Sequence, residues 1–458
     1  MSFDSRRVLM EAHLMVRNFL ETCGYDGSLA AFDLEAEAFL GDIPRNMSQP
    51  QPLIEMLNDK HMADLQRQLS GMRLPSKAEE HDFEVPGDGS MPDTLLATER
   101  DIHHSNIIVA KTALVAVTSP EAAVPVLATA AADRTVKLTV LDRAVGEYQP
   151  GQVARIFQPH QGVVLDIDFH PHVPHLMLTS SMDKSTVLTN AITGQQHQIF
   201  HDHSKFVTRA RFAMNGNLIV TGSHDRTVVV YKVVPGSGDS AGGMLPVYAK
   251  DKEFSFKGTV EGFCVLPPSP NRPPTVVIGT RDDNYLHYID LVQYTTTRFN
   301  MNANSDDWVS FTPLEISASP HNDGAYLLVS TDSASGRQIL FRTGSSLQLQ
   351  NYYGVPTDGF STTKHAWDRS GKYFFVSGND FKIYCFEVGG QQKIVGKLEG
   401  HTAAIRGLFM DQERRLLISC SFDKTVRLWG HHSDLQVGQR MLGRQEQARE
   451  DAVMTPMS

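Results

Sequence analysis

The sequence is poor in the features that mark several large classes of protein. Among its 458 residues there are only four cysteines, widely separated and without a Cys-x-x-Cys pair: Cys23, Cys264, Cys385 and Cys420. This excludes a disulfide framework and a cysteine-based zinc site. No stretch approaches the roughly 18 consecutive apolar residues of a membrane-spanning helix. The first 20 residues mix charges among their apolar positions and form no signal-peptide core. We therefore expect an intracellular, soluble protein, cytoplasmic or nuclear and not secreted, without membrane insertion.

An excess of positive charge is also missing. The chain has 42 Lys and Arg against 52 Asp and Glu, a formal net charge of −10. Because a general nucleic-acid binder normally carries a basic surface, direct nucleic-acid binding is not expected. The hydrophobic content of 41% is ordinary for a folded protein and too high for a chain that is disordered throughout. Protein or peptide partners are the expectation that remains.

What the sequence has is repetition. An aspartate followed by alternating apolar residues recurs at spacings of 50, 42, 58, 49, 48 and 43 residues: Asp133, Asp183, Asp225, Asp283, Asp332, Asp380 and Asp423. Each aspartate follows a run rich in β-forming residues, such as 218–221 or 416–419. Period-2 apolar patterning on both sides of a tight turn predicts a pair of strands. Repetition of this unit predicts a β-rich repeat architecture instead of several unrelated domains.

Two repeats carry the same set of four side chains, with a histidine 22 residues before the aspartate: His203, Thr221, Asp225 and Tyr231, and His401, Ser419, Asp423 and Trp429. With these residues the chain from about 93 to 430 resembles the WD-repeat β-propellers. The resemblance implies seven four-stranded blades. It also implies that the histidine, the hydroxyl, the aspartate and the aromatic residue form a buried hydrogen-bonded network that stabilises each blade.

The other repeats match the set less completely. The second has His160, Thr179 and Asp183, with Thr189 in place of the aromatic residue; the first has Thr129 and Asp133, with either His103 or His104 displaced by an insertion. In repeats four to six we place Gly279, Leu328 and Val376 at the hydroxyl position, and we predict an insertion at 333–336. The register of these three repeats remains open.

A ring of blades must close. The last repeat ends at Trp429 as the third strand of its blade, which leaves an unpaired strand edge. The segment 93–101 precedes the first repeat and is predicted to supply the closing strand. Truncation near residue 100 should therefore destabilise the whole propeller.

The N-terminal segment 5–40 has the pattern of two short helices. Residues 5–23 place Val16, Phe19 and Leu20 on one apolar face, Gly24 supplies a helix stop, and Leu29 and Phe32 lie on a second helix. This segment resembles the LisH motif, which implies dimerisation. Two short helices bury too little surface to be stable alone, so pairing of two copies into a four-helix bundle is expected. Packing on the chain's own propeller is the alternative. The dimer contacts are predicted at Val16, Phe19, Leu20, Leu29 and Phe32.

The remaining segments connect or flank these parts. Residues 41–92 contain one amphipathic helix, predicted from Pro52 to Leu69, followed by a polar stretch typical of a flexible linker. Residues 431–458 are rich in Gln, Arg and Glu and are predicted to be a disordered or helical tail.

Three patterns suggest chemistry. Gly238–Gly242 matches the Gly-x-Ser-x-Gly elbow of hydrolases through Ser240, but no strand precedes it and no helix follows. His170, His172 and His175 suggest a metal site, yet the prolines between them favour an extended turn in blade two. The His–Asp–hydroxyl sets resemble a catalytic triad, but their repetition favours a structural role. We expect no enzyme activity, no cofactor and no metal site.

Recognition of partners is the function that remains. The resemblance implies binding on the narrow top face, where residues beside the turn aspartates emerge: Ala132, Met182, His224, Asp282, Thr331, Asn379 and Phe422. Lys205, Phe206 and Arg406 should share this face. Met, Phe and Arg side chains often anchor interfaces. We therefore predict partner binding by Met182, Phe206, His224, Arg406 and Phe422, with ordinary loop surface as the alternative for each.

These observations favour a non-catalytic, dimeric scaffold or adaptor that assembles protein complexes. A substrate-recognition subunit of a ubiquitin ligase is the alternative of the same broad class, although Gly430 and His432 do not fit its usual signature. A hydrolase that uses Ser240 is the alternative of a different class.

Overall fold

The computed structural model describes residues 91–141, 153–237, 245–302, 311–333, 335–358 and 362–431. Of the predicted N-terminal module it describes only Val16, Arg17, Leu20 and Phe32, all of them helical and half-buried. Phe19, Leu29 and the rest of residues 1–90 lie outside the described residues, as do the Ser240 loop and the tail after residue 431. The LisH module, the homodimer and the helix at 52–69 therefore stay predictions.

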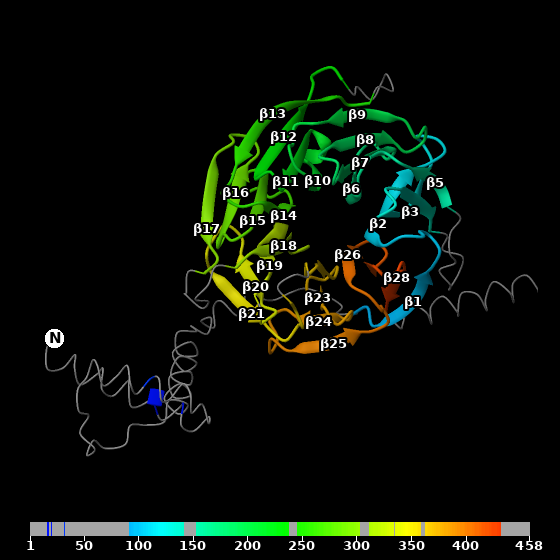
Figure 1. The fold of residues 1–458 in the computed structure, drawn as a ribbon. Helices are drawn as coiled ribbons and strands as arrows, with labels where there is room; N and C mark the ends of the chain where they lie inside the picture. The colour runs from blue at the N-terminus through cyan, green and yellow to red at the C-terminus, as the bar shows by residue number, and fades with distance from the viewer. Residues whose placement is uncertain are drawn as a thin grey trace, which may run out of the picture. The chain divides into compact units, whose positions relative to one another are not determined.

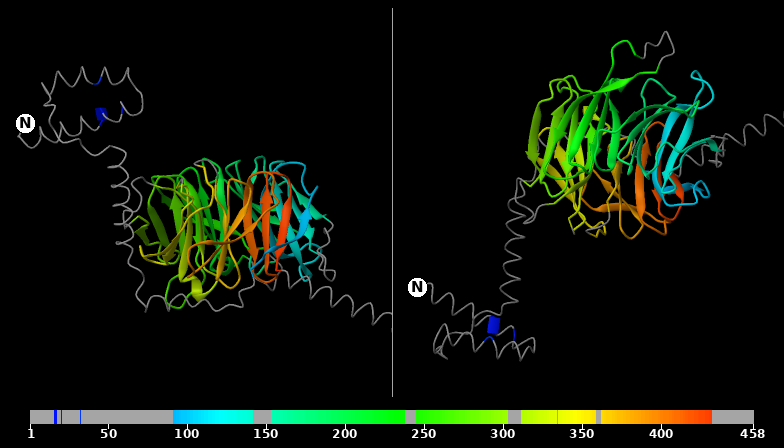
Figure 2. Two further views of the ribbon diagram at one scale, coloured as in Figure 1. Left: turned by 90° about the horizontal axis from the view of Figure 1, so that it is seen from below. Right: turned by 45° about the horizontal axis from the view of Figure 1, so that its top comes forward.

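Seven four-stranded antiparallel sheets stand as blades around a common axis, and the predicted seven-bladed β-propeller is confirmed (Figure 1). Two further views show the blades side by side in one ring (Figure 2). In each blade the strands follow one another from the innermost to the outermost position. Only blade seven departs from this order, because its outermost strand comes from the N-terminal side of the propeller.

The first four blades contain these strands. Blade one consists of β2 (Ile107–Ala116), β3 (Ala123–Ala131), β4 (Val136–Val140) and β5 (Val153–Phe157). Blade two consists of β6 (Val164–Phe169), β7 (Leu176–Ser181), β8 (Thr186–Asn190) and β9 (Gln196–Phe200). Blade three consists of β10 (Val207–Ala213), β11 (Leu218–Ser223), β12 (Thr227–Val233) and β13 (Tyr248–Ser255). Blade four consists of β14 (Val260–Val265), β15 (Thr275–Thr280), β16 (Tyr285–Asp290) and β17 (Thr296–Asn300).

The last three blades complete the ring. Blade five consists of β18 (Pro313–Ala318), β19 (Tyr326–Thr331), β20 (Gln338–Arg342) and β21 (Gln348–Tyr352). Blade six consists of β22 (His365–Trp367), β23 (Tyr373–Ser377), β24 (Ile383–Glu387) and β25 (Ile394–Leu398). Blade seven consists of β26 (Ile405–Asp411), β27 (Leu416–Ser421), β28 (Val426–Gly430) and β1 (Thr94–Glu99). Short 3-10 turns, η2 (Met214–Gly216) and η3 (Asn322–Gly324), lie in blades three and five.

The closing strand lies where the sequence predicts it. β1 pairs antiparallel with β28, with Leu95 opposite Trp429 and Ala97 opposite Leu428. The amide of Asp93 extends this pairing by donating to the carbonyl of Gly430 over 2.9 Å. The pairing covers the edge of β28 and joins the first and last parts of the propeller chain.

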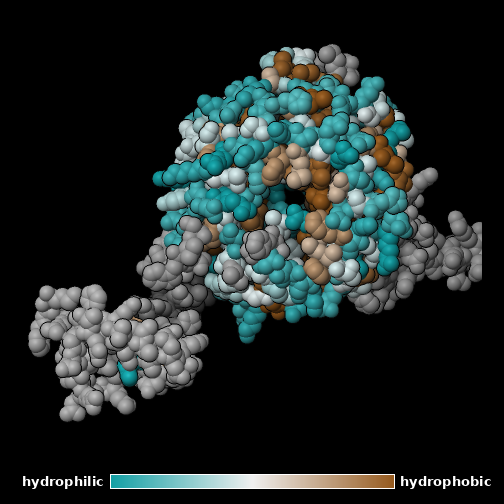
Figure 3. Space-filling view, viewed as in Figure 1, coloured by the Kyte–Doolittle hydropathy of each residue, from teal (hydrophilic) through white to brown (hydrophobic). Residues whose placement is uncertain are grey.

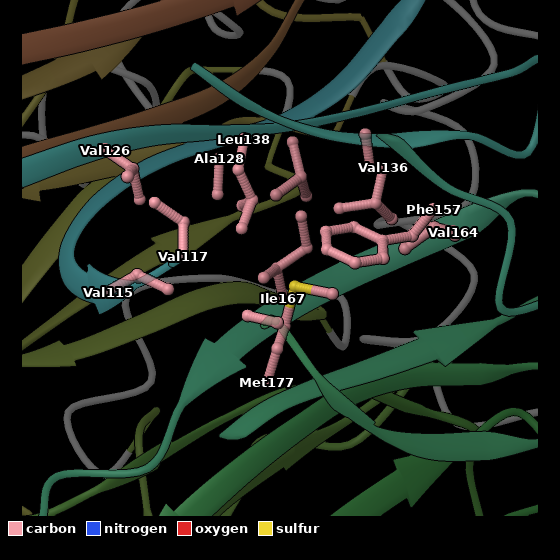
Figure 4. Close-up of a cluster of buried hydrophobic side chains, with 13 residues drawn as sticks. Val115, Val117, Val126, Ala128, Val136, Leu138, Phe157, Val164, Ile167 and Met177 are labelled. Atoms are coloured by element: carbon pink, nitrogen blue, oxygen red, sulfur yellow. The ribbon is translucent and has the colours of Figure 1, made fainter. Parts of the chain in front are cut away.

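The core of the propeller lies between neighbouring blades. The second strand of a blade is covered on both faces, and β7, β11, β15, β19 and β27 are buried along their whole length. One hydrophobic cluster fills each interface between adjacent blades. Figure 4 shows the cluster between blades one and two, where Phe157 lies with Val136, Val164 and Ile167. Burial on both faces explains why these strands are continuous apolar runs.

The register of blade four differs from the prediction by one residue. β15 pairs so that Gly279 takes the place that Gly222 has in blade three, and Ile278 takes the place of Thr221. The hairpin between β15 and β16 contains one more residue than the hairpin of blade three. The prediction that Gly279 occupies the hydroxyl position assumed a constant distance from the aspartate and is therefore wrong. Ile278 occupies this position, which is apolar.

Blade five differs in the same way, because the loop between β19 and β20 is longer, as the predicted insertion implied. Val329, not Leu328, takes the place of Thr221. The amide of Asp332 donates to the carbonyl of Thr312 over 3.1 Å, as that of His224 does to Phe206 in blade three. Asp332 therefore lies one position before that of a turn aspartate, and its prediction as one is wrong.

Blade six follows the predicted register. Val376 pairs with Tyr384 as Thr221 pairs with Val229, so Val376 does occupy the hydroxyl position.

Candidate protein-interaction face

The turn aspartates build the hairpins between the second and third strands. In blade three, Asp225 Oδ1 accepts from the amide of Thr227 over 3.0 Å, and the residue between them, Arg226, has a φ of +72°. The same arrangement occurs at Asp133, Asp183 and Asp423. Aspartate favours such turns because its carboxylate satisfies a nearby backbone amide. These hairpins place one loop of each blade at the same end of the ring, which we call the top face.

The complete set predicted in blade seven is confirmed. His401 Nδ1 lies 2.8 Å from Asp423 Oδ2, and its Nε2 lies 2.8 Å from Ser419 Oγ. Trp429 Nε1 donates to the same Ser419 Oγ over 2.9 Å. In blade three, His203 bridges Asp225 and Thr221 in the same way, at 3.0 and 2.8 Å. The hydroxyl of Tyr231 donates to Asp202 over 3.0 Å, which extends this set beyond the predicted residues.

Blades one and two carry the same bridge. In blade two His160 lies 3.0 Å from Asp183 and 2.9 Å from Thr179. In blade one the structure distinguishes between the two predicted histidines, because His103 Nε2 lies 2.9 Å from Thr129 Oγ1. Its Nδ1 lies 3.4 Å from Asp133 Oδ2.

Burial and hydrogen bonding set the charge states within these bridges. Burial lowers the pKa of His203 in spite of the opposing effect of Asp225, which favours the neutral imidazole. Burial would raise the pKa of Asp423, but hydrogen bonds from His401 and Thr425 hold it well below its usual range. The hydroxyl residues Thr129, Thr179, Thr221 and Ser419 have 0% exposure. A substrate has no access to a nucleophile at these positions, so the sets satisfy buried polar groups.

Blades four and six contain a substitute that the sequence reasoning missed. His287 Nε2 lies 2.9 Å from Asp283 Oδ2, and Tyr384 donates to Asp380 Oδ2 over 2.7 Å. Both residues lie on the third strand of their blade, four positions after the aspartate. A polar residue at this position does not by itself identify the substitute, because blades one and seven also carry one there, Lys137 and Arg427.

Four of the five predicted partner-binding residues line one opening, and the fifth, Phe422, packs against one of the four. Met182, Phe206, His224 and Arg406 line a central channel of about 520 Å³. The Phe206 and His224 rings pack with centroids 4.0 Å apart, and the Arg406 guanidinium lies 5.3 Å from the centroid of the Phe422 ring. We call these five the rim residues. The view along the axis shows the central opening, with hydrophobic residues along one side of it (Figure 3).

The other positions predicted for the top face differ in exposure. Ala132, Lys205 and Asp282 are exposed, and Asn379 is half-buried. Thr331 has 0% exposure and donates to the carbonyl of Arg337 over 2.8 Å, so its prediction as a surface residue is wrong. The shifted register of blade five explains this, because Thr331 takes the place of the buried Ser223.

Paired charges line the wall of the channel. Asp166 binds Lys111 over 3.0 Å and also binds Arg211, while Glu315 binds Arg209 and Lys364 over 2.6 and 2.7 Å. Burial would raise the pKa of Asp166, but Arg211 and Lys111 lower it to about 2. These ion pairs connect the innermost strands of blades one to three and of blades three, five and six. No sequence pattern linked these residues.

The histidine-rich loop of blade two is a turn between β6 and β7, as predicted. His170 Nδ1 accepts from the amides of His172 and Val173 over 3.1 and 2.9 Å. The His170 ring packs edge-on against Phe212, with centroids 5.0 Å apart. Within the residues that the structure describes, no group of three or more His, Cys, Asp or Glu side chains is placed to hold a metal ion.

Comparison with known protein families identifies WD40 repeats. Three segments match the family model described as WD domain, G-beta repeat: residues 151–189, 194–232 and 392–430. Each matched segment runs from the outermost strand of one blade to the third strand of the next. The last segment therefore ends at β28, and the outermost strand of blade seven is supplied by β1. A search of curated proteins found no match. In the part of the chain that the structure describes, no helix has the length and apolar character needed to cross a membrane.

These findings agree on the general character of the chain. It carries WD40 repeats in a seven-bladed β-propeller. Propellers of this kind are commonly protein-interaction scaffolds and are typically not enzymes.

Proposed function

We propose that this protein is a non-catalytic scaffold that binds a protein or peptide partner on the top face of its propeller. The observation that carries this proposal is the convergence of four rim residues on the mouth of one channel, with Phe422 packed against Arg406. They come from blades two, three and seven and from segments up to 240 residues apart, Met182 to Phe422. Met182 is 48% exposed, and aromatic and Arg residues beside it are the types that dominate binding energy at interfaces.

The channel has the size of a binding site. A volume of about 520 Å³ falls in the range of roughly 300–1,000 Å³ that is typical of ligand sites. The ion pairs around Asp166 and Glu315 line the walls. A partner would therefore insert side chains into the mouth while its backbone lies across the rim.

Affinity capture with the full-length protein tests this proposal. A variant with Met182→Ala, Phe206→Ala, Arg406→Ala and Phe422→Ala should lose the proteins that the wild type captures, as measured by quantitative mass spectrometry. The matched control is Val292→Ala with Leu347→Ala, at 58% and 46% exposed positions in turns at the opposite end of the strands. The proposal fails if the rim variant and the control variant capture the same proteins as the wild type.

We also propose that two copies pair through the N-terminal module, which would present two top faces to a multivalent partner and raise avidity without new contacts. The support is the sequence pattern at 5–40 and the helical conformation of Val16, Leu20 and Phe32. Light scattering coupled to size exclusion should give a dimer for the full chain and a monomer for Leu20→Asp with Phe32→Asp. A monomeric wild type would remove the dimer from the proposal and leave the binding face untouched.

A further inference from the structure

Arg406 differs from the other cations of the channel. Lys111, Arg209, Arg211 and Lys364 each bind a carboxylate within 3.0 Å. Among the described residues, Arg406 has no carboxylate partner within ion-pair distance, and its guanidinium donates a single hydrogen bond, to Thr362 Oγ1 over 2.8 Å. Its Nε is buried without a hydrogen-bond partner. A guanidinium has five N–H donors, so most of the hydrogen-bonding capacity of Arg406 is unused.

An unpaired cation with an unsatisfied donor is unfavourable for the free protein. Burial lowers the pKa of Arg406, although an arginine stays protonated in proteins. Buried polar groups are normally hydrogen-bonded, and an exception requires an explanation. The face of Phe422, 5.3 Å away, orients the guanidinium without neutralising it.

The acidic groups of the channel do not supply the missing partner. Glu261 is held by Arg281 over 2.8 Å and by His224 over 3.5 Å. Glu315 is held by Arg209 and Lys364. Each of these carboxylates already has two partners, and among the described residues neither they nor Asp166 and Asp168, which also line the channel, form an ion pair with Arg406.

The surroundings of Arg406 define the shape of a ligand. Met182 and Phe206 supply an apolar part of the rim, and the channel mouth has room for a side chain. We infer that Arg406 anchors a carboxylate: the mouth accepts an Asp or Glu side chain of an extended protein segment whose apolar neighbours contact Met182 and Phe206. This inference rests on the proposed function and specifies the chemistry of the partner.

A carboxylate fits this site better than a phosphate. Arg406 is one uncompensated guanidinium, whereas a doubly charged phosphate is usually held by several donors. The other Lys and Arg side chains of the channel already bind Asp166 or Glu315, so they are not free to hold a second negative charge. A single acidic side chain matches the one available positive charge.

Peptide selection tests this inference. A phage-displayed library of random short peptides is selected on the immobilised full-length protein, and a selected peptide is synthesised with Glu, Gln or phosphoserine at its acidic position. Dissociation constants are measured for the wild type, Arg406→Gln, Arg406→Lys and the control Arg226→Gln, which removes a charge from an exposed position of the β11–β12 hairpin. The melting temperature and the binding of the Gln peptide show whether each variant is folded.

The expected result is a coupling between Arg406 and the acidic position. Replacing Glu by Gln in the peptide should weaken binding to the wild type and to Arg226→Gln by about tenfold to a hundredfold, the size of a hydrogen bond to a charged group. On Arg406→Gln the same replacement should change little. Arg406→Lys should give an intermediate effect because it keeps the charge and loses the planar fork. The phosphoserine peptide should bind more weakly than the Glu peptide.

Two results would overturn the inference while the proposed function stands. One is selection of peptides without an acidic residue that nevertheless lose binding to Met182→Ala with Phe206→Ala. The other is an equal effect of the Glu-to-Gln replacement on the wild type and on Arg406→Gln. Tighter binding of phosphoserine than of Glu would overturn the choice of a carboxylate. If no selected peptide depends on any rim residue, both the inference and the proposed binding face fail.

Discussion

Arg209 in blade three and Glu315 in blade five form an ion pair of 2.6 Å, although blade four stands between them. Arg209 also donates to the carbonyl of Phe263 in blade four as it passes, over 3.2 Å. Gly262 lies beside the Arg209 side chain: a Cβ there would be in ordinary van der Waals contact with Arg209 Cζ at 3.9 Å and in tight contact with the carbonyl oxygen of Leu314 at 3.2 Å. A side chain larger than a methyl group at Gly262 would therefore compete with Arg209 for this space.

This relationship predicts a large effect of Arg209→Met. Removing one member of a buried pair leaves an incompletely compensated charge on Glu315, and the free energy of unfolding should fall by about 3 kcal/mol. Urea denaturation at neutral pH measures the loss. Combining Arg209→Met with Glu315→Gln should recover part of it. If the losses of stability measured for Arg209→Met and Glu315→Gln simply add in the double variant, the two residues are not coupled.

Gly262→Leu should break the same pair from the side of blade four. Its side chain would occupy the passage of Arg209, so its effect should not add to that of Arg209→Met. Denaturation of both single variants and the double variant gives the comparison, and strict additivity would contradict the role assigned to Gly262.

Tyr384→Phe tests the substitute network of blade six. The hydroxyl of Tyr384 is bonded to Asp380 Oδ2, and Asp380 Oδ1 is buried without a partner. Loss of this donor leaves the carboxylate less satisfied and should lower the free energy of unfolding by about 1–3 kcal/mol. The control is Tyr285→Phe on the third strand of blade four, which should be nearly neutral. Equal effects of the two changes would contradict the assignment.

Removal of β1 tests the closure of the ring. A chain that begins at residue 91 keeps β1 and should resist limited proteolysis, whereas one that begins at residue 102 keeps His103 but exposes the edge of β28. The second form should be cleaved much faster throughout the propeller. Similar rates of cleavage for the two forms would mean that β1 is dispensable.

His365 predicts a pH dependence of stability. Burial lowers its pKa from the usual 6.5 to about 4, and its ring nitrogens lie 2.6 Å from the hydroxyls of Ser317 and Ser330. Between these two pH values the unfolded chain binds a proton that the folded protein does not, so stability falls as the pH falls. Between pH 7.5 and 5.0 this residue should account for a loss of up to about 2 kcal/mol. His365→Gln should remove that part of the loss in urea denaturation, and parallel curves for the two proteins would contradict the assignment.

The sequence predicts the ring of blades well because its signals are local. Each turn aspartate lies beside a β-rich run, and the histidine of a complete set lies at a constant distance from it, as in His203 and His401. The register of blades four and five was predicted incorrectly, because the extra hairpin residues leave the alternation of apolar residues intact and so give no signal of their presence. Nothing in a single sequence links Arg209 to Glu315, which are 106 positions apart. The charge pattern of the channel, and with it the isolation of Arg406, emerges only from the fold.

The binding face is tested most directly by site-specific photo-crosslinking. A photoreactive amino acid at Met182, 48% exposed on the rim, should form covalent adducts with protein partners in cells. The matched position is Leu347, 46% exposed in the turn between β20 and β21 at the opposite end of the strands. We predict adducts at residue 182 that are absent at residue 347 and that disappear when Phe206 and Arg406 are replaced by alanine. The same adducts at both positions, or none at residue 182, would contradict partner binding at the rim.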